Sequence, residues 1–285
     1  MKKGLVLEGG AMRGLFSAGV MDVLMENNLI FDGAVGVSAG ACFGCNYKSG
    51  QKGRVIRYNL RFCRDRRYCS VKSLITTGNI FGAEFCYHTI PDKLDVFDSE
   101  TFEKNPMEFF VVATDIETGK AVYHRMSKAN YHELEWIRAS ASMPFASKIT
   151  EINGRKFLDG SIADSIPLKF MESMGYDKNI VILTQPRNFI KTQNKNLSLI
   201  RKTYRKYPAF VKSFESRPEM YNNELNFIRK SEREGRAFVI APPEKLPIGH
   251  IEHNPNKLLE VYRIGRKTAL SIIDDIIDFL NCNPL

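Results

Sequence analysis

Five residues with the pattern Gly-X-Ser-X-Gly could support nucleophilic chemistry: Gly36-Val37-Ser38-Ala39-Gly40. Apolar residues between 29 and 35 lead into them, and a compact run, residues 41–45, follows. Strand, tight turn and helix is the context in which a serine hydroxyl is raised at the tip of a strand. The flanking glycines carry no Cβ that would crowd the backbone, and the start of the helix directs free N–H groups at the site. The pattern therefore predicts Ser38 as a nucleophile.

A serine hydroxyl is a poor nucleophile until a base accepts its proton, and the usual base is histidine. The chain has five histidines, at positions 88, 124, 132, 250 and 253. The order Ser38, Asp159 and then His250 or His253 formally fits an α/β-hydrolase triad. In that fold several strands precede the nucleophile, whereas here there is room for one strand before the strand that ends at Ser38. We therefore expect the histidines to be surface or packing residues.

A carboxylate is the other candidate base, and Asp159-Gly160-Ser161 offers one at a turn. Gly160 allows the backbone to approach closely. An exposed aspartate, with a pKa of about 3.9, is a weak base, but desolvation in a site closed by lipid would raise that pKa. The alternative is that Asp159 and Gly160 form an ordinary Asx turn, and the dipeptide alone does not decide between the two.

A glycine-rich loop, residues 8–14, lies between the first expected strand, residues 4–7, and a helix over 15–28. It could cradle a nucleotide phosphate, but Ala11 stands where the dinucleotide pattern needs its second glycine, and no Walker lysine-serine pair follows. It could instead supply N–H groups to an oxyanion, because loops after neighbouring parallel strands meet at one sheet edge. The nearby nucleophile favours the second interpretation. The loop residues concerned are Gly9, Gly10, Ala11, Arg13 and Gly14.

The rest of the chain predicts further strands and helices in an order typical of one mainly parallel α/β sheet. Expected strands are 109–114, 121–123 as a hairpin return, 157–158 after an Asn-Gly turn, 180–184 and 238–240. A helix is expected over 131–141, and another begins after Asn254, with Pro255 at its first position, and runs to about Leu280. The late strand predicts that the C-terminal part joins the same sheet.

Composition limits the class of protein. The 285 residues are 44% hydrophobic and 26% charged, which is ordinary for a globular chain. The six cysteines form no disulfide framework, and Cys42 and Cys45 are expected to be reduced packing residues and not a redox or zinc pair. No targeting segment or membrane-spanning run is evident, so we expect a cytoplasmic protein whose membrane contact, if any, is peripheral on the inner face. No metal or cofactor is expected.

Positive charge gathers in two segments of a chain whose net charge is +9. Residues 48–72 contain nine Lys or Arg and one acid, and residues 187–236 contain thirteen Lys or Arg and five Glu. Such segments could hold the protein on an anionic membrane. They could equally be solvated helix faces whose long side chains cover apolar neighbours, and both interpretations stay open.

Together, residues 8–14, 36–40 and 159–161 resemble the motifs of the patatin-like phospholipase family, and residues 113–115 and 139–145 resemble its intervening segments. The resemblance implies a three-layer α/β/α fold with a mainly parallel central sheet and covers an acyl-hydrolase domain over 4–172. The motifs do not cover the C-terminal region over 173–285, which we expect to be a helical, basic extension with strands that join the same sheet. It also implies a Ser38–Asp159 dyad without histidine that cleaves acyl esters of lipids.

Two positions depart from the family pattern: Ala11, where many members have a third glycine, and Ser161, where Gly or Ala is commoner. The leading hypothesis is a serine acyl hydrolase acting on phospholipid or another acyl ester through an acyl-enzyme. An acyl-CoA thioesterase or acyltransferase with the same dyad is a second hypothesis. A non-catalytic basic binding module is the third, and nucleic acid is not the partner we expect.

Overall fold

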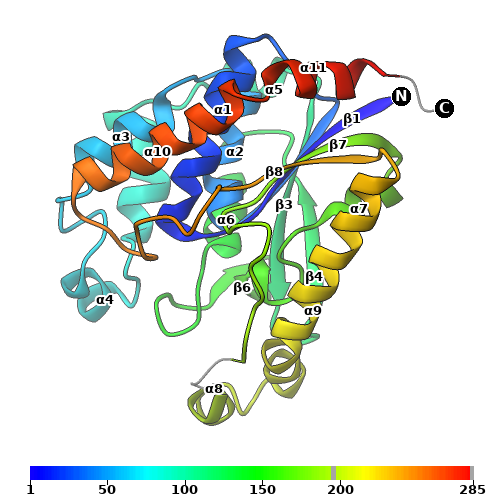
Figure 1. Cartoon of the computed structure of the whole chain (residues 1–285). Helices are drawn as coiled ribbons and strands as arrows, with labels where there is room; N and C mark the ends of the chain where they lie inside the picture. Colours follow the sequence, from blue (N-terminus) through cyan, green and yellow to red (C-terminus); the bar gives the residue numbers. More distant parts are fainter. Residues whose placement is uncertain (194–196, 283–285) are drawn as a thin grey trace.

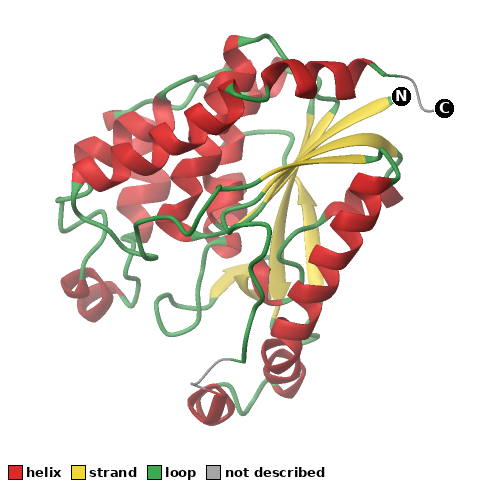
Figure 2. Cartoon of the chain, viewed as in Figure 1, coloured by secondary structure: helices red, strands yellow, loops and turns green. Residues whose placement is uncertain are grey.

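A twisted sheet of eight strands forms the centre of the molecule, and helices cover both of its faces (Figures 1 and 2). The computed structural model describes residues 1–193 and 197–282. The strands are β1 (Lys2–Leu7), β2 (Gly33–Val37), β3 (Glu108–Asp115), β4 (Ala121–Arg125), β5 (Thr150–Ile152), β6 (Arg155–Asp159), β7 (Tyr176–Ile182) and β8 (Ala237–Ile240). Strands β1 and β2 are apolar along most of their length and buried on both sides, as the central strands of a parallel sheet must be.

The strand order is β5-β6-β3-β2-β1-β7-β8, with β4 also paired to β3. Strands β3, β2, β1, β7 and β8 run parallel. Strands β4 and β6 each pair antiparallel with β3, and β5 pairs antiparallel with β6. The predicted hairpin returns, β3–β4 and β5–β6, are confirmed, and the C-terminal strands β7 and β8 do belong to this sheet.

The helices form two layers around the sheet. On one face lie α1, α2, α3 and α10, and on the other lie α7 and α9 (Figure 1). The helical segments are α1 (Leu15–Glu26), α2 (Ala39–Lys48), α3 (Arg54–Phe62), α4 (Val71–Thr77), α5 (Ser99–Lys104), α6 (Tyr131–Ser140), α7 (Leu168–Ser173), α8 (Leu197–Thr203), α9 (Pro208–Arg233), α10 (Pro255–Leu270) and α11 (Ile273–Asn281). In addition there are two short 3-10 turns, η1 (Ala11–Gly14) and η3 (Gly160–Ile162), and a π-helix, η2 (Phe85–Leu94). The three-layer α/β/α architecture is therefore as predicted. Among the described residues, none of these helices has the length and apolar character needed to cross a bilayer.

Strand β6 continues the line of β2 along the same edge of β3. The last pair of β2 with β3 joins Val37 to Val112, and Asp159 in β6 pairs with the next residue, Ala113. Strand β4 pairs with both Val112 and Ala113, so it occupies the other edge of β3 and leaves β2 and β6 on one side. The end of β6 thus meets the end of β2 head on, which brings Asp159 to the turn that follows Val37.

The C-terminal helix α10 packs closely against α1 because glycines stand at the contact. A Cβ at Gly19 would lie 2.1 Å from the Tyr262 carbonyl oxygen, and a Cβ at Gly265 would lie 2.0 Å from that of Phe16. The prediction of a single helix from Asn254 to about Leu280 is wrong in one respect. Helix α10 ends at Leu270, and a separate helix, α11, starts at Ile273. Ser271 Oγ donates to the Thr268 carbonyl at 2.8 Å, a local bond that competes with helix continuation.

Only some of the basic side chains in residues 48–72 are exposed on the surface. Lys48 and Arg54 are buried: Lys48 Nζ donates to the Met107 carbonyl at 2.5 Å, and Arg54 pairs with Asp95 at 3.3 Å. The remaining Lys and Arg side chains of this segment are exposed: Lys52, Arg57, Arg61, Arg64, Arg66, Arg67 and Lys72. In the second segment, Lys195 lies outside the described residues.

Candidate active site

Ser38 occupies a strained turn between β2 and α2. Its backbone has φ 54° and ψ −120°, a positive-φ conformation that residues other than glycine rarely adopt. The turn is tight enough to exclude side chains at its glycines: a Cβ at Gly36 would lie 2.5 Å from the Gly40 carbonyl oxygen, and one at Gly40 would lie 2.3 Å from that of Leu7. The turn therefore has the geometry expected of a nucleophile elbow.

The Asp159 carboxylate accepts a hydrogen bond from the Ser38 hydroxyl. Ser38 Oγ donates to Asp159 Oδ2 at 2.8 Å, while Asp159 Oδ1 accepts the Ser161 N–H at 2.9 Å. The Asx turn and the contact with Ser38 therefore coexist, one on each carboxylate oxygen. Asp159 is 2% exposed, and burial raises the pKa of this carboxyl despite its hydrogen bonds with Ser161 and Ser38. Gly160 allows the turn to lie on β3, since a Cβ there would be 2.1 Å from the Val112 carbonyl oxygen.

Ser140, at the end of α6, holds the backbone of the turn. Its Oγ accepts the Ser38 N–H at 2.8 Å, and the side chain is fully buried. Two residues further on, the Ser142 carbonyl accepts the Asp159 N–H at 2.8 Å. The segment after α6 therefore contacts both Ser38 and Asp159.

The glycine-rich loop lies directly over Ser38. A Cβ at Gly9 would come within 2.9 Å of Ser38 Cβ, and one at Gly10 within 2.6 Å of Thr184 Oγ1. Ala11 has φ 49°, so the alanine adopts the left-handed conformation for which glycine is better suited. Within the described part of the chain, the N–H groups of Gly9, Gly10 and Ala11 have no hydrogen-bond acceptor.

Gly14 and Arg13, although adjacent in the chain, contact different parts of the site. A Cβ at Gly14 would lie 2.9 Å from Ala39 Cβ, so this glycine lets η1 pack on the start of α2. Arg13 instead extends into a polar cavity, and its buried Nε has no hydrogen-bond partner among the described residues. The structure thus brings Gly9, Gly10 and Ala11 beside Ser38, while the Arg13 side chain belongs to the wall of a neighbouring cavity.

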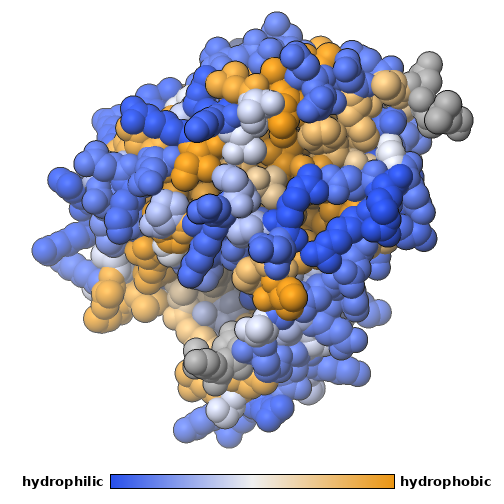
Figure 3. All heavy atoms as spheres, in the orientation of Figure 1, coloured by the Kyte–Doolittle hydropathy of each residue, from blue (hydrophilic) through white to orange (hydrophobic). Residues whose placement is uncertain are grey.

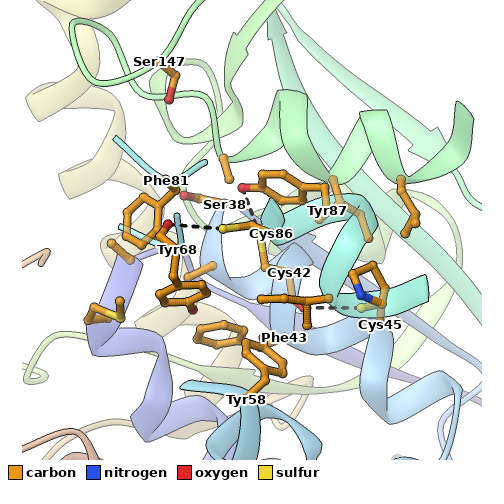
Figure 4. A pocket seen from close by; sticks show the side chains of 18 of the residues that line it. Ser38, Cys42, Phe43, Cys45, Tyr58, Tyr68, Phe81, Cys86, Tyr87 and Ser147 are labelled. Atoms are coloured by element: carbon orange, nitrogen blue, oxygen red, sulfur yellow. Dashed lines mark hydrogen bonds between the residues drawn. The ribbon is translucent and has the colours of Figure 1, made fainter. Parts of the chain in front are cut away.

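Two cavities meet at Ser38. One, of about 120 Å³, is lined mainly by apolar and aromatic side chains, among them Phe43, Tyr58 and Phe81 (Figure 4). The other, of about 460 Å³, is lined by polar and charged groups together with Asp159. A hollow opens in the lower middle of the surface, between α4 and α9 (Figure 3). Ser38 borders both cavities, so a molecule bound across it would have one apolar end and one polar end.

Among the described residues, which include all five histidines, none of these imidazoles hydrogen-bonds to Ser38 or Asp159. His253 Nδ1 lies 2.6 Å from the Cys63 carbonyl oxygen, and His88 and His124 contact Glu135 and Glu133. His250 lines the polar cavity, where partial burial and the charges of nearby Arg and Lys side chains lower its pKa to about 4.

The cysteines of the C-x-x-C pair lie on α2 and line the apolar cavity. Burial raises the pKa of both Cys42 and Cys45 thiols to about 12, so neither is a thiolate near neutral pH. Both are free cysteines.

Ser161, the second departure from the family pattern, connects Asp159 to the C-terminal region. Arg217 in α9 donates from Nε to the Ser161 carbonyl and from Nη2 to Ser161 Oγ, both at 2.7 Å. Arg217 therefore lies two hydrogen bonds from the carboxylate that faces Ser38. Sequence reasoning missed Ser140, Lys191 and Arg217 as site residues. Ser140 lies in the segment 139–145 that resembles the family, whereas no local pattern around Lys191 or Arg217 indicated their positions.

Comparison with known proteins is consistent with this arrangement. A mainly parallel sheet covered by helices, with a serine on a strained turn after its second strand, defines an α/β fold with a candidate nucleophile at the edge of the sheet. The family model described as patatin-like phospholipase matches residues 5–171, and the chain belongs to that family. Members of this family are enzymes of the lipid ester hydrolase type, and so is this protein. A second model, described as a domain of unknown function, matches residues 207–281.

Several relatives are similar over different lengths. The chain is 28% identical to the uncharacterized protein YjjU of Escherichia coli over 92% of its own length and 74% of that protein. It is 25% identical to an uncharacterized NTE family protein of Mycobacterium tuberculosis over 62% of its length and 48% of the relative. It is 28% identical to the lysophospholipase nte1 of Aspergillus niger over 61% of its length and 11% of that protein. A crystal structure of VipD from Legionella pneumophila aligns over 96% of this chain and 67% of VipD, with a TM-score of 0.49 and 11% identity.

Proposed function

We propose that the protein is a serine acyl hydrolase that cleaves lipid esters with Ser38 as nucleophile and Asp159 as its base. The observation that carries the proposal is the 2.8 Å hydrogen bond from Ser38 Oγ to Asp159 Oδ2 at a strained turn open to two cavities. Burial of Asp159 supports its role, since a raised pKa makes the carboxylate a better proton acceptor than an exposed aspartate.

Acyl transfer to the enzyme is the first half of the reaction. Ser38 Oγ attacks the ester carbonyl carbon while its proton passes to Asp159 Oδ2. The resulting oxyanion is stabilised by the free N–H groups of Gly10 and Ala11, together with that of Ala39 at the start of α2. When the tetrahedral intermediate collapses, the bond to the alcohol breaks, and the leaving alkoxide takes the proton from Asp159.

Hydrolysis of the acyl-enzyme is the second half. Asp159 accepts a proton from an incoming water, whose oxygen attacks the acyl carbon, and Ser38 leaves with that proton. The apolar cavity holds the acyl chain in both halves, because its walls are largely aromatic and aliphatic (Figure 4). The polar cavity leaves room for the alcohol to depart and for water to enter.

Labelling with a fluorophosphonate probe, followed by an ester assay, tests this proposal. We expect the wild-type chain to be labelled at Ser38 and to release fatty acid from a lysophospholipid. Ser38→Ala should abolish both, and Asp159→Asn should slow both by about 10²–10⁴-fold, the usual size of a general-base contribution. Labelling that survives Ser38→Ala would overturn the assignment of the nucleophile.

Two other functions give different results in the same assay. A thioesterase or acyltransferase would be labelled but would turn over acyl-CoA faster than lysophospholipid. A binding module without catalysis would show no labelling and no turnover, and salt-sensitive retention of nucleic acid would then favour it.

A further inference from the structure

The polar cavity beside Ser38 is surrounded by cationic side chains from distant parts of the chain. Arg13 comes from η1, Lys191 from the segment after β7, and Arg217 from α9. The backbone of Lys191 is fixed to α9, because its N–H donates to Asn222 Oδ1 at 2.9 Å and its carbonyl accepts from Asn222 Nδ2 at 3.0 Å. Its Nζ lies 4.7 Å from the centre of the Tyr221 ring. We call Arg13, Lys191 and Arg217 the cation cluster.

Within the residues described, no member of the cation cluster forms a salt bridge. Two carboxylates face the same cavity, Glu8 and Asp159, but their oxygens have other donors. Glu8 Oε1 accepts from the Tyr221 hydroxyl at 2.7 Å and Oε2 from the Thr184 N–H at 2.5 Å. The two oxygens of Asp159 accept hydrogen bonds from the Ser38 hydroxyl and the Ser161 N–H. Three cations and two carboxylates therefore leave positive charge without a counterion.

The buried Nε of Arg13 has no hydrogen-bond partner among the described residues, and an unpaired cationic donor is costly. The cationic side chains of the cluster also repel one another. Burial, then the charges of Arg217 and Arg13, lower the pKa of Lys191 to about 8. His250 at the rim is uncharged near neutral pH and adds no cation. A bound anion would satisfy the free donors and offset the repulsion.

We propose that the cation cluster binds the phosphate of the substrate, an inference that rests on the proposed function. The preferred substrate is then an acylated glycerol phosphate with a bare phosphate headgroup. The acyl chain lies in the apolar cavity, the ester carbonyl at Ser38, and the phosphate in the polar cavity. Phosphate oxygens match the guanidinium donors of Arg13 and Arg217 in geometry and charge. A choline headgroup would instead bring a quaternary ammonium toward the cluster, and a neutral acylglycerol would leave it unpaired.

The experiment compares three substrates that carry the same acyl chain at one mole fraction in neutral detergent micelles: lysophosphatidic acid, lysophosphatidylcholine and monoacylglycerol. We expect kcat/KM for lysophosphatidic acid to exceed that for monoacylglycerol by about tenfold or more, the size of a charge-assisted hydrogen bond or two. Lys191→Met should reduce this ratio severalfold, mainly through KM. Lys267→Met, which removes the same charge from an exposed site on α10, should leave the ratio unchanged.

A neutral chromogenic ester, p-nitrophenyl octanoate, separates failure of this inference from failure of the proposed function. If the ester is not hydrolysed and Ser38 is not labelled, the proposed function is wrong. If the ester is hydrolysed but the ratio is near one, or falls equally in Lys191→Met and Lys267→Met, the phosphate site is wrong. Inorganic phosphate should compete with lysophosphatidic acid; competition without a preference for the phosphate-bearing lipid would show that the cavity takes free anions and would also overturn the inference.

Discussion

Ser140 Oγ accepts the N–H of Ser38 at 2.8 Å, so a side chain at the end of α6 fixes the backbone of the turn that carries the nucleophile. The donor and acceptor are both buried, and the turn is strained at Ser38. A strained conformation persists only where its surroundings hold it. Ser140 is therefore a positioning residue, and its removal should affect Ser38 more than the fold.

Ser140→Ala leaves the Ser38 N–H without its acceptor. We expect unfolding free energy to fall by about 1–3 kcal/mol, the cost of a buried unsatisfied donor, and the labelling rate of Ser38 to fall as the turn relaxes. Ser142→Ala is the matched control, because its hydroxyl bonds to Arg138 and Thr150 and not to Ser38. Equal labelling rates for the two folded variants would contradict this role of Ser140.

Ala11→Gly should be tolerated, whereas Gly9→Ala should be harmful. Glycine at position 11 removes the strain of φ 49°, about 1 kcal/mol for a left-handed residue, although part is offset by greater freedom of the unfolded chain. Alanine at position 9 would bring its Cβ within 2.9 Å of Ser38 Cβ and displace the loop. Thermal unfolding and ester hydrolysis should show Ala11→Gly as stable and active as the wild type, and Gly9→Ala as impaired in both.

The loss of activity at low pH should reflect protonation of Asp159. Burial raises its pKa above the ordinary value of 3.8, and the protonated acid cannot accept the Ser38 proton. We therefore expect kcat/KM on a neutral ester to be retained at high pH and to fall, as pH is lowered, at a midpoint above 3.8. A profile that stays flat to below that value in a protein still folded by circular dichroism would argue against Asp159 as the base.

Lys191 should give a second pH dependence, on the alkaline side. Its pKa of about 8 means that it is charged at pH 7 and largely uncharged at pH 9. Arg13 and Arg217 stay charged over that range. Glu8, Asp159 and His250 face the same cavity. Burial raises the pKa of Glu224, whose charge also acts on Lys191. KM for lysophosphatidic acid should rise from pH 7 to pH 9, and Lys191→Arg, which remains charged, should flatten the rise. A rise of equal size with p-nitrophenyl octanoate would show that Lys191 does not act on the phosphate.

Contact with an anionic membrane stays a prediction. Exposed Val71 and Ile75 on α4 stand beside exposed basic residues such as Arg66 and Lys72, and Figure 3 shows apolar atoms over α4 at the lower left. We expect sedimentation with vesicles that contain anionic phospholipid, weakened by salt and by the double substitution of Arg66→Gln and Lys72→Gln. Equal binding to neutral and anionic vesicles at low salt would remove the prediction.

Ser38 and Asp159 could be proposed from sequence because their motifs depend on local chemistry. Glycines at 36 and 40 are needed wherever a serine lies on such a tight turn, and an aspartate followed by glycine favours an Asx turn. The glycine loop was likewise identifiable, as were the hairpin returns at β4 and β6. The division of the chain between residues 172 and 173 stays a prediction.

Local patterns alone determined which residues could act as nucleophile, base and oxyanion donors, since each depends on a few neighbours in the chain. Tertiary structure decided which of them meet. Strand β6 joins β3 directly beyond the end of β2, so Asp159 arrives at Ser38, and α9 brings Arg217 to Ser161. Lys191 and Arg217 had no local signature, and the motif around Ser140 did not reveal its contact with Ser38, because a hydroxyl or a charge acquires its role here only from the groups packed against it.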